Sequence, residues 1–358
     1  MTIDEKISLL QEVGEEIVDE EELKTLLQKK LDKGRDIFAY DGFEPSGQIH
    51  IAQGLLRAIN VNKLIKAGIK FKFLIADWHA AANQKFKGNL ETIKKVGDFF
   101  IEVWKACDMD LTNVEFLYAS DLVKDPAYWE LVLKISINIT LKRVKRCTQI
   151  MGRSESDKLY ASQILYPIMQ AADVFYLGVD ICQLGLDQRK VNMLAREVAK
   201  SLKRPKPVSI HHHMLMGLSR PPETDLKGVD RVVKLKMSKS NPDSAIFMLD
   251  STADIKRKIN KAYCPPKLIE ENPVLEYCKF IIFEKIEKLL IERPEKYGGS
   301  IEYTSYEELE KDYAEGKLNP PDLKPAVVKY LDQLLEPVRK HFRDDDNAKD
   351  LGDFVKGL

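Results

Sequence analysis

The sequence predicts an α/β protein with a Rossmann-like parallel-sheet domain that is followed by a mostly α-helical domain. In the first part of the chain, short apolar runs such as 71–76 and 114–118 alternate with segments of helical periodicity. Strands that alternate with helices are typical of a parallel sheet covered on both faces. From about residue 254 the spacing is mostly helical, and prolines at 265–266, 294 and 320–321 interrupt it.

Length and composition agree with this division. The chain has 358 residues, of which 44% are hydrophobic and 31% charged, as in an ordinary globular protein with about two domains. We expect a helical segment at 1–35, the sheet domain at 36–253 with a polar loop at 220–240, and the helical domain at 254–358. Basic and acidic residues both number 56, so the net charge does not indicate a nucleic-acid partner.

The cysteines and the N-terminus predict a cytoplasmic location. The five cysteines are widely spaced and form no Cys-x-x-Cys pair, which indicates free thiols in a reducing compartment rather than a zinc site. Residues 1–6 lack the layout of a secretion signal. No apolar run is long enough to span a membrane, so we expect no membrane partner.

The predicted elements follow one another along the chain. Residues 3–33 have the spacing of two acidic amphipathic helices, the first with apolar positions from Leu9 to Ile17, and Gly34 is suited to end the second. Asn89 is placed to cap a helix that runs to Cys107. The other predicted elements are a helix from Leu55 that Gly68 ends, strands at 71–76, 114–118, 179–182 and 208–210, and helices at 126–150, 158–176 and 187–202.

Residues 38–53 connect the first predicted strand of the sheet domain to a helix. They read FAYDGFEPSGQIHIAQ, which indicates a strand, a Pro-Ser-Gly turn and the first turn of a helix. Gly42 and Gly47 permit unusual backbone conformations or the close approach of another molecule. His50 falls where free backbone N–H groups and the positive end of a helix dipole meet an anion. A Gly-rich connection of the kind found in many α/β domains explains the stretch equally well.

A second stretch, Lys236-Met237-Ser238-Lys239-Ser240, follows a polar segment without helical or strand periodicity. Its ammonium groups and hydroxyls suit a polyphosphate, because they neutralise charge and donate hydrogen bonds. Taken alone, a solvated basic loop is the simpler interpretation.

Three polar residues share one face of a predicted helix. Tyr166, Gln170 and Asp173 stand at positions i, i+4 and i+7. Such a row usually faces solvent. Here it is expected to line a cavity or to be paired inside one, because its neighbours are the apolar residues Leu165, Ile168, Met169, Ala172 and Val174.

Together these stretches resemble the class I aminoacyl-tRNA synthetases, which combine a Pro-Ser-Gly-x-Ile-His type of turn with a downstream KMSKS loop. The stretches at 40–47, 166–173 and 185–190 are similar to tyrosyl-tRNA synthetases of the archaeal and eukaryotic cytosolic type. The resemblance runs from about residue 36 to about residue 340. It implies a catalytic domain at 36–253 and an anticodon-recognition domain at 254–358.

The resemblance implies a tyrosine–tRNA ligase. In this reaction the carboxylate of L-tyrosine attacks the α-phosphate of ATP, giving tyrosyl-adenylate and pyrophosphate, and the tyrosyl group then passes to tRNA(Tyr). No protein nucleophile is needed, so catalysis rests on positioning and on stabilising charge at the phosphates. The catalytic residues implied by the resemblance are His50, Gln53, Lys236 and Lys239.

The resemblance also implies the residues that bind the two substrates. Asp173 and Tyr40 would hold the phenol of tyrosine, while Tyr166, Gln170 and Gln188 would bind its α-ammonium group. Phenylalanine would leave both buried partners unpaired, and tyrosine enzymes are the standard example of this discrimination. Mg²⁺ is expected to accompany ATP, without a readable set of protein ligands. The implied ATP site comprises Gly42, Gly47, His50, Gly185, Asp187, Met214, Leu215, Lys236, Ser238 and Lys239.

One stretch departs from the His-Ile-Gly-His pattern of the class, because it reads His50-Ile51-Ala52-Gln53. Gln53 can donate a hydrogen bond but cannot carry charge. Ala52 places a methyl group where the class has glycine. The role of Gln53 is therefore left open.

RNA contacts and a dimer are implied as well. Arg189 and Lys190 are expected at the first base pair of the acceptor stem, Tyr297 is expected to stack on the first anticodon base, and Asp322 to accept hydrogen bonds from it. The family is homodimeric, with tRNA bound across both subunits. The basic stretch Lys142, Arg143, Lys145, Arg146 and Arg153 could contact RNA phosphates, although a solvated face is the simpler interpretation.

The histidines do not predict a metal site. His211, His212 and His213 are consecutive, and consecutive strand residues point to alternate faces, so they cannot all face one ion. By resemblance this segment lies beside the adenine. His79 follows a predicted strand near the expected site, where a packed or solvated histidine is the simpler interpretation.

Three alternatives remain open at this point. A tryptophan-specific relative shares the fold, but Asp173 with Tyr40 favours a phenol, because indole only donates. A small-molecule adenylyltransferase would not need the helical C-terminal domain. A non-catalytic RNA-binding paralogue would have no need of Lys236, Lys239, Gln170, Asp173 and Gln188.

Overall fold

The computed structural model describes residues 1–152, 158–237 and 241–358. These residues form two compact units, which are described separately. The first unit comprises residues 1–46, 60–101 and 110–213, and the second comprises residues 47–59, 102–109 and 214–358. The division into functional domains at residues 35 and 253 stays a prediction.

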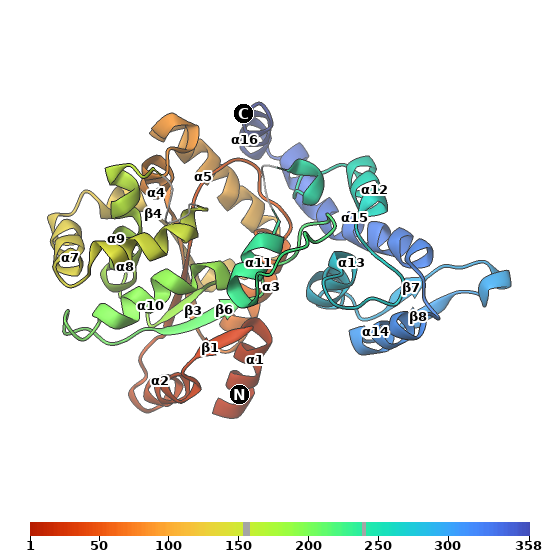
Figure 1. Ribbon diagram of the computed structural model, residues 1–358, viewed down its shortest axis with the longest axis horizontal. Coiled ribbons are helices and arrows are strands. Elements are labelled where there is room, and N and C mark those ends of the chain that lie inside the picture. Colours follow the sequence, from red (N-terminus) through yellow and green to blue (C-terminus); the bar gives the residue numbers. More distant parts are fainter. Residues whose placement is uncertain (153–157, 238–240) are drawn as a thin grey trace. The chain divides into compact units, whose positions relative to one another are not determined.

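The first unit is built on a six-stranded sheet with the strand order β1-β6-β5-β2-β3-β4 (Figure 1). Strands β2 to β6 pair in parallel, and β1 pairs antiparallel with β6 at one edge. The strand order reverses beside β2, which lies between β3 and β5, and sheets of this kind bind ligands at the carboxyl ends of the strands at such a point. The prediction of a Rossmann-like parallel sheet is confirmed. The strands are β1 (Glu16–Val18), β2 (Phe38–Phe43), β3 (Lys70–Ile75), β4 (Val114–Tyr118), β5 (Ile181–Gly185) and β6 (Val208–His212).

Helices cover both faces of this sheet. Tyr40 and Leu74 belong to a buried apolar cluster with helices α7 to α10, which gather on one side of the sheet in Figure 1. On the other face α5 comes close to β3, because a Cβ atom on Gly97 would lie 2.5 Å from Cγ2 of Ile75. The α-helices up to residue 213 are α1 (Ile3–Val13), α2 (Glu20–Lys33), α3 (Leu55–Lys66), α4 (Asp77–Ala82), α5 (Leu90–Lys105), α6 (Ala119–Leu122), α7 (Pro126–Ile137), α8 (Leu141–Cys147), α9 (Ala161–Tyr176) and α10 (Arg189–Val198). The short helices are η1 (Lys85–Gly88), η2 (Leu111–Asn113), η3 (Thr148–Met151) and η4 (Leu186–Gln188).

Local signals in the sequence account for several boundaries. The side chain of Asn89 accepts a hydrogen bond from the backbone N–H of Thr92 at 3.0 Å, as predicted for the start of α5. Gly34 ends α2 in a left-handed conformation with φ of 61°. The prediction for Ile17 is wrong, because α1 ends at Val13 and residues 16–18 form the edge strand β1. Pairing with β6 gives these backbone groups partners in the sheet, and this outweighs the helical spacing of their side chains.

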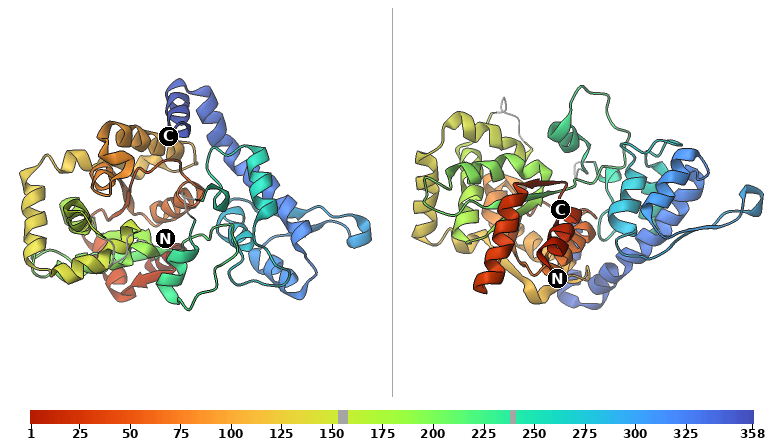
Figure 2. Two further views of the ribbon diagram at one scale, coloured as in Figure 1. Left: turned by 45° about the horizontal axis from the view of Figure 1, so that its top comes forward. Right: turned by 90° about the horizontal axis from the view of Figure 1, so that it is seen from below.

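The second unit is mostly helical. It also contains an antiparallel pair of strands, β7 (Leu289–Ile291) and β8 (Ile301–Tyr303), which the sequence analysis missed. The connection between these strands extends from the helices as an arm (Figures 1 and 2). Helix α11 lies in the 220–240 segment, where no helix was predicted. The helices are α11 (Gly228–Leu235), α12 (Thr252–Lys261), α13 (Pro273–Tyr277), α14 (Tyr306–Glu315), α15 (Pro320–Asp344) and α16 (Asp346–Lys356), with the short helices η5 (Pro242–Ser244), η6 (Cys278–Ile282) and η7 (Glu295–Tyr297).

None of the helices in the described ranges combines the length and the apolar composition needed to cross a lipid bilayer.

Candidate active site

Polar side chains of the first unit gather near the carboxyl ends of its central strands. Helix α9 contributes the predicted row of Tyr166, Gln170 and Asp173, which are only 6%, 7% and 1% exposed. The row therefore faces the interior, as expected for polar residues in an apolar helix. Tyr40 comes from β2, and Gln188 from η4, directly after β5.

Two buried side chains hold the carboxylate of Asp173. The hydroxyl of Tyr128, on α7, donates to Oδ1 at 2.8 Å. Nε2 of His79, on α4, lies 3.1 Å from Oδ2. A buried charge is tolerated only when it is paired and hydrogen-bonded, so Tyr128 and His79 supply what this carboxylate needs. Tyr128 was not among the predicted site residues.

The environment of His79 favours its charged form. Burial lowers the pKa of His79, but the carboxylates of Asp173, Glu44 and Asp77 raise it by more, so that the net pKa is raised. The ring also meets the ring of Tyr166 edge-on, with 5.0 Å between their centroids. The interpretation of His79 as a packed histidine is confirmed, and its ion partner is the predicted phenol-binding residue.

Tyr40 presents an unsatisfied hydroxyl in the same region. The residue is fully buried, and its hydroxyl has no hydrogen-bond partner among the described residues. Burial raises the pKa of Tyr40 well above its usual value, with added contributions from Cys182 and Asp173, so the hydroxyl keeps its proton. A buried hydroxyl without a partner is costly, which indicates that a ligand completes its hydrogen bonding.

A second polar group surrounds Glu44, directly after β2. The hydroxyl of Tyr166 donates to Oε2 at 3.1 Å, and Nδ2 of Asn83 lies 3.1 Å from both carboxylate oxygens. Nζ of Lys85 lies 3.3 Å from Oε1. Glu44 and Asn83 were missed as site residues, although Glu44 belongs to the stretch that carried the resemblance.

The side chains of Gln170 and Gln188 are joined by a hydrogen bond, which Nε2 of Gln170 donates to Oε1 of Gln188 at 3.1 Å.

The first unit holds all five predicted tyrosine-binding residues, namely Tyr40, Tyr166, Gln170, Asp173 and Gln188. It also holds three of the predicted ATP-binding residues, namely Gly42, Gly185 and Asp187.

Gly47, His50 and Gln53 lie in the second unit. Gly47 has φ of 110°, which residues with a side chain rarely adopt. His50 forms an isolated β-bridge with Phe247, and its carbonyl accepts the backbone N–H of Gln53 at 2.9 Å. Residues 51–54 form a turn and α3 begins at Leu55, so His50 precedes the helix instead of lying in its first turn. The side-chain oxygen of Gln53 is buried without a partner among the described residues.

The backbone next to Lys236 pairs with the segment after β6. The backbone N–H of Met237 donates to the carbonyl of Leu215 at 3.2 Å, and Lys236 forms a β-bridge with Met216. Lys236 is therefore held beside Leu215, close in sequence to Met214. The other predicted residues of this loop, Ser238 and Lys239, lie outside the described residues, as does Arg153.

The predicted acceptor-stem residues lie at the start of α10. Nε of Arg189 donates to both carboxylate oxygens of Glu16, at 2.9 and 2.8 Å. The ammonium group of Lys190 donates to the side chain of Gln149. In the basic stretch, Arg143 pairs with Glu197 at 2.8 Å.

The predicted anticodon residues lie in the second unit. Tyr297 is 60% exposed and belongs to η7 on the arm, whereas Asp322 is in the first turn of α15. Arg293 connects the two segments, because its Nε donates to the carbonyl of Gly299 at 3.0 Å and its Nη1 lies 4.0 Å from Oδ2 of Asp322.

The consecutive histidines make separate contacts. His211 contacts Glu16 at 2.7 Å, and His212 contacts Gln183 at 3.1 Å. His213 contacts Glu15 at 3.0 Å. In the part of the chain that the structure describes, no group of three His, Cys, Asp or Glu side chains is arranged to hold a metal ion.

A parallel sheet with buried polar side chains near its switch point, followed in the sequence by a KMSKS motif, is the arrangement expected of a class I aminoacyl-tRNA synthetase. A family model described as tRNA synthetases class I (W and Y) matches residues 32–336, and the chain belongs to this family. Within it, relatives of 38–49% identity are named for tyrosine.

Three relatives illustrate the likeness. Tyrosine–tRNA ligase 1, cytoplasmic, of Arabidopsis thaliana is 49% identical over 352 residues, which are 98% of this chain and 87% of the relative. The tyrosyl-tRNA synthetase of Pyrococcus horikoshii, solved with L-tyrosine, is 38% identical with a TM-score of 0.91 and full coverage of both chains. The Leishmania major enzyme, solved with tyrosinol, is 42% identical with a TM-score of 0.88. This chain is fully covered in that comparison but spans only 52% of the Leishmania chain.

We predict that Tyr128→Phe destabilises the protein by about 1.5–3 kcal/mol, because the buried carboxylate of Asp173 loses a hydrogen bond. Thermal unfolding of the ligand-free protein measures the change. Tyr176→Phe is the matched control, since it removes a hydroxyl that donates at 2.7 Å to the less buried Asp125. Equal effects of the two substitutions would show that burial of Asp173 does not matter.

Proposed function

We propose that this protein is a tyrosine–tRNA ligase, which activates L-tyrosine with ATP and transfers the tyrosyl group to tRNA(Tyr). The observation that carries the proposal is the buried group of Tyr40, Asp173, Tyr128 and His79 in a chain that is 49% identical to a tyrosine–tRNA ligase. The phenol of tyrosine donates a hydrogen bond to Asp173 and accepts one from Tyr40, whose hydroxyl otherwise has no partner among the described residues.

The opposite end of the substrate meets the polar group around Tyr166. The α-ammonium group of tyrosine carries three donors, and the oxygens of Tyr166, Gln170 and Gln188 accept them. The carboxylate of Glu44, 3.1 Å from the hydroxyl of Tyr166, adds negative charge on this side. The ends of the row on α9 are seven residues apart, or about 10 Å of helix, so the two ends of one amino acid meet different residues.

Adenylate formation requires positioning and compensation of charge. The carboxylate of tyrosine forms a bond to the α-phosphorus of ATP, and pyrophosphate leaves with the electrons of the broken P–O bond. His50, Lys236 and Lys239 stabilise the phosphates, and Gln53 contributes a hydrogen bond. Mg²⁺ enters with the nucleotide, because it is usually held by substrate phosphates together with few protein groups. The ATP site comprises Gly42, Gly47, His50, Gly185, Asp187, Met214, Leu215, Lys236, Ser238 and Lys239.

The tRNA contacts follow from two groups of residues. Arg189 and Lys190, the first two residues of α10, contact the acceptor stem. At the anticodon, the exposed ring of Tyr297 stacks on the first base and Asp322 accepts its hydrogen bonds. Asp322 is supported by Arg293, which also bonds the backbone of the arm.

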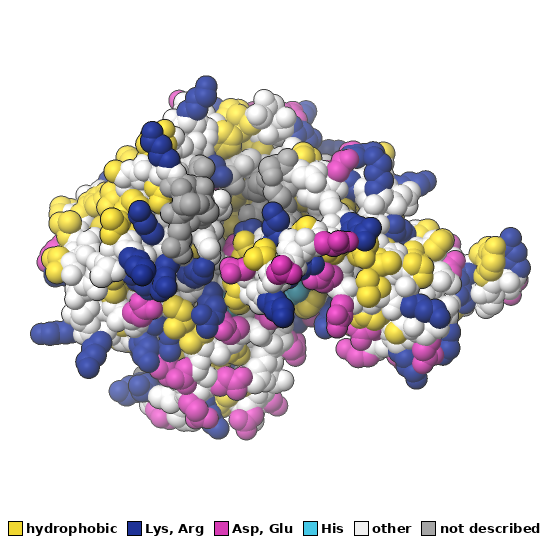
Figure 3. All heavy atoms as spheres, in the orientation of Figure 1, with side chains coloured by type: hydrophobic (Ala, Val, Ile, Leu, Met, Phe, Trp, Pro, Cys, Tyr) yellow, Lys and Arg dark blue, Asp and Glu magenta, His cyan; other side chains and the backbone are white. Residues whose placement is uncertain are grey.

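The protein acts as a homodimer in the cytoplasm, where the Arabidopsis relative is also named. An exposed apolar row on α7 and at the start of α8 supports the dimer, and apolar side chains gather over α7 in Figure 3. A second copy of the chain would remove this row from water. The row consists of Trp129, Leu133, Ile137 and Leu141, which are 38%, 63%, 82% and 58% exposed.

The alternatives are less well supported. A tryptophan enzyme would leave Asp173 and Tyr40 without matching groups, because indole offers one donor and no acceptor. An adenylyltransferase for small molecules would not require the anticodon residues. A non-catalytic paralogue would not require the buried polar pocket.

Tyrosine specificity is the first prediction of this proposal. We expect the protein to exchange pyrophosphate with ATP in the presence of L-tyrosine but not of tryptophan or phenylalanine. Asp173→Ala should lower the exchange by about 100-fold, because the phenol loses a charged acceptor. Absence of exchange with tyrosine, or equal exchange with tryptophan, would refute the proposed activity.

Recognition of the anticodon is tested by Asp322→Ala. We expect the charging of tRNA(Tyr) to fall by about 10-fold, since one hydrogen-bonded base contact is worth about 1–3 kcal/mol. ATP–pyrophosphate exchange should stay unchanged. Asp344→Ala, at the other end of α15, is the control and should leave both reactions intact. Loss of exchange with normal charging would contradict the assignment.

The dimer is tested by Ile137→Asp, which places a charge in the middle of the apolar row. We expect light scattering to report a dimer for the parent protein and a monomer for the variant, because burying an unpaired carboxylate is costly. Ile137→Leu keeps the apolar surface and should remain dimeric. If Ile137→Asp remains dimeric, another surface forms the interface.

A further inference from the structure

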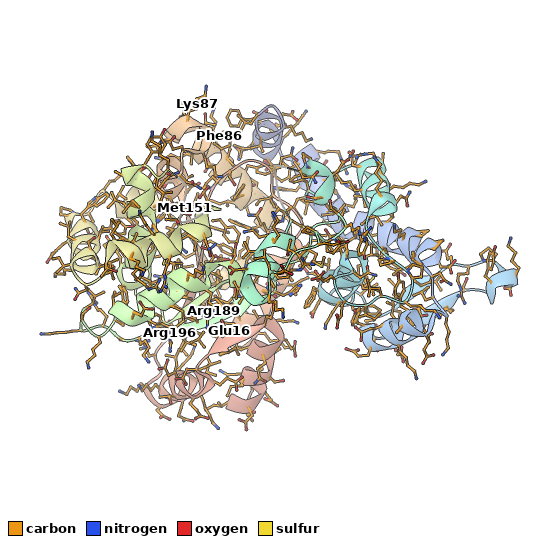
Figure 4. The ribbon with its side chains drawn as sticks, in the orientation of Figure 1. Glu16, Phe86, Lys87, Met151, Arg189 and Arg196 are labelled. Atoms are coloured by element: carbon orange, nitrogen blue, oxygen red, sulfur yellow. The ribbon has the colours of Figure 1, made fainter. Side chains whose placement is uncertain are left out.

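The edge strand β1 places one acidic side chain beside α10. Glu16 stands opposite His211 in the antiparallel pairing of β1 with β6. Residues that are directly opposite in a pair of strands point to the same face of a sheet. The carboxylate of Glu16 lies there between His211 and Arg189, and Figure 4 places Glu16 next to Arg189.

Four side chains, Asn192, His211, Glu16 and Arg189, form a chain of hydrogen bonds. Nδ2 of Asn192 lies 3.0 Å from Nε2 of His211, and Nδ1 of His211 lies 2.7 Å from Glu16. The amide of Asn192 donates to Nε2, so Nδ1 of His211 carries the proton and donates to Glu16. Burial lowers the pKa of the fully buried His211, despite the opposing effect of Glu16, which agrees with a neutral ring. Asn192 and Arg189 lie one turn apart on α10, so the network fixes the carboxylate relative to the start of that helix.

This carboxylate fixes the direction of Arg189. Both carboxylate oxygens of Glu16 accept from Nε of Arg189, at 2.9 and 2.8 Å. The Nη groups of Arg189 donate to no other residue in the described ranges, and the side chain is 39% exposed. The guanidinium is planar, so holding Nε restricts the orientation of the group and leaves its Nη donors for another acceptor.

We propose that Glu16 is a positioning residue, which presents the Nη donors of Arg189 to the acceptor end of tRNA. This inference rests on the proposed function, in which Arg189 contacts the acceptor stem directly after the tyrosine-binding Gln188. A guanidinium with a fixed direction loses less conformational entropy when RNA binds. The N-terminal segment thereby acts in the transfer step, not in the activation of tyrosine.

A competing view is that Glu16 neutralises Arg189 and weakens its attraction for RNA. The two views predict opposite signs. If Glu16 positions Arg189, its loss impairs the charging of tRNA. If Glu16 competes with RNA for Arg189, its loss improves charging.

Glu16→Gln in the full chain separates these views, because it removes the charge and keeps the size. We expect kcat/KM for the charging of tRNA(Tyr) to fall by about 10-fold, while ATP–pyrophosphate exchange with tyrosine stays unchanged. Glu16→Asp, which keeps the charge on a shorter side chain, should give a smaller loss and serves as a second variant if Glu16→Gln does not fold. In an Arg189→Ala background, Glu16→Gln should cause no further loss, because both residues act through one contact.

The matched control is Glu22→Gln. Glu22 also ties the N-terminal segment to α10, through an ion pair with Arg196 at 2.9 Å, but it does not touch Arg189. We expect this variant to charge tRNA normally. A loss equal to that of Glu16→Gln would assign the effect to general attachment of the segment and overturn the inference.

Further outcomes distinguish a failure of this inference from a failure of the two proposals on which it rests, the acceptor-stem contact of Arg189 and the tyrosine–tRNA ligase activity. Normal or improved charging by Glu16→Gln, together with impaired charging by Arg189→Ala, overturns the role of Glu16 alone. Normal charging by Arg189→Ala overturns the acceptor-stem contact and the inference with it. Absence of tyrosine-dependent exchange in the parent protein overturns the proposed function itself.

Discussion

The requirement to pair a buried carboxylate organises the pocket of the first unit. Asp173 is 1% exposed on an apolar helix, and a charge in such a place is tolerated only with hydrogen-bond donors around it. Tyr128, on α7, donates a hydrogen bond to it, and the ring of His79, on α4, is its ion partner. The placement of α4, α7 and α9 around the central strands is therefore tied to this one side chain.

The same requirement explains how the pocket can choose its ligand. The buried hydroxyl of Tyr40, on β2, has no partner among the described residues. The carboxylate of Asp173 can accept further hydrogen bonds besides its contacts with Tyr128 and His79. Only a ligand group that both donates and accepts satisfies the two at once, and a phenol does so. The polar group of Glu44 and Tyr166 lies at the other end of the row, where a positive charge is favoured. In the proposed tyrosine site, the side chains that select the ligand are therefore in place before it binds.

The sequence predicted the five parallel strands of the sheet and the inward-facing row on α9, because both depend on local spacing. It did not predict Tyr128 or Glu44, since their roles come from contacts with residues far away in the chain. Tyr128 bonds a residue 45 positions later, and Glu44 one that is 122 positions later. No periodicity carries such information. The helical spacing up to Ile17 was misleading for a similar reason, because the partner of that backbone is β6, almost at the other end of the unit.

The edge strand β1 connects these observations. An exposed sheet edge is a site for unwanted pairing, and proteins usually cover it. In this chain β1 covers the edge of β6 and is only three residues long. The register of this pairing brings Glu16 to the neutral His211 and to Arg189. A shift of the register by one residue would turn Glu16 to the opposite face of the sheet. The pairing of β1 with β6 therefore does two things at once, because it covers the edge of β6 with a strand of only three residues and holds the side chain of an arginine that directly follows Gln188.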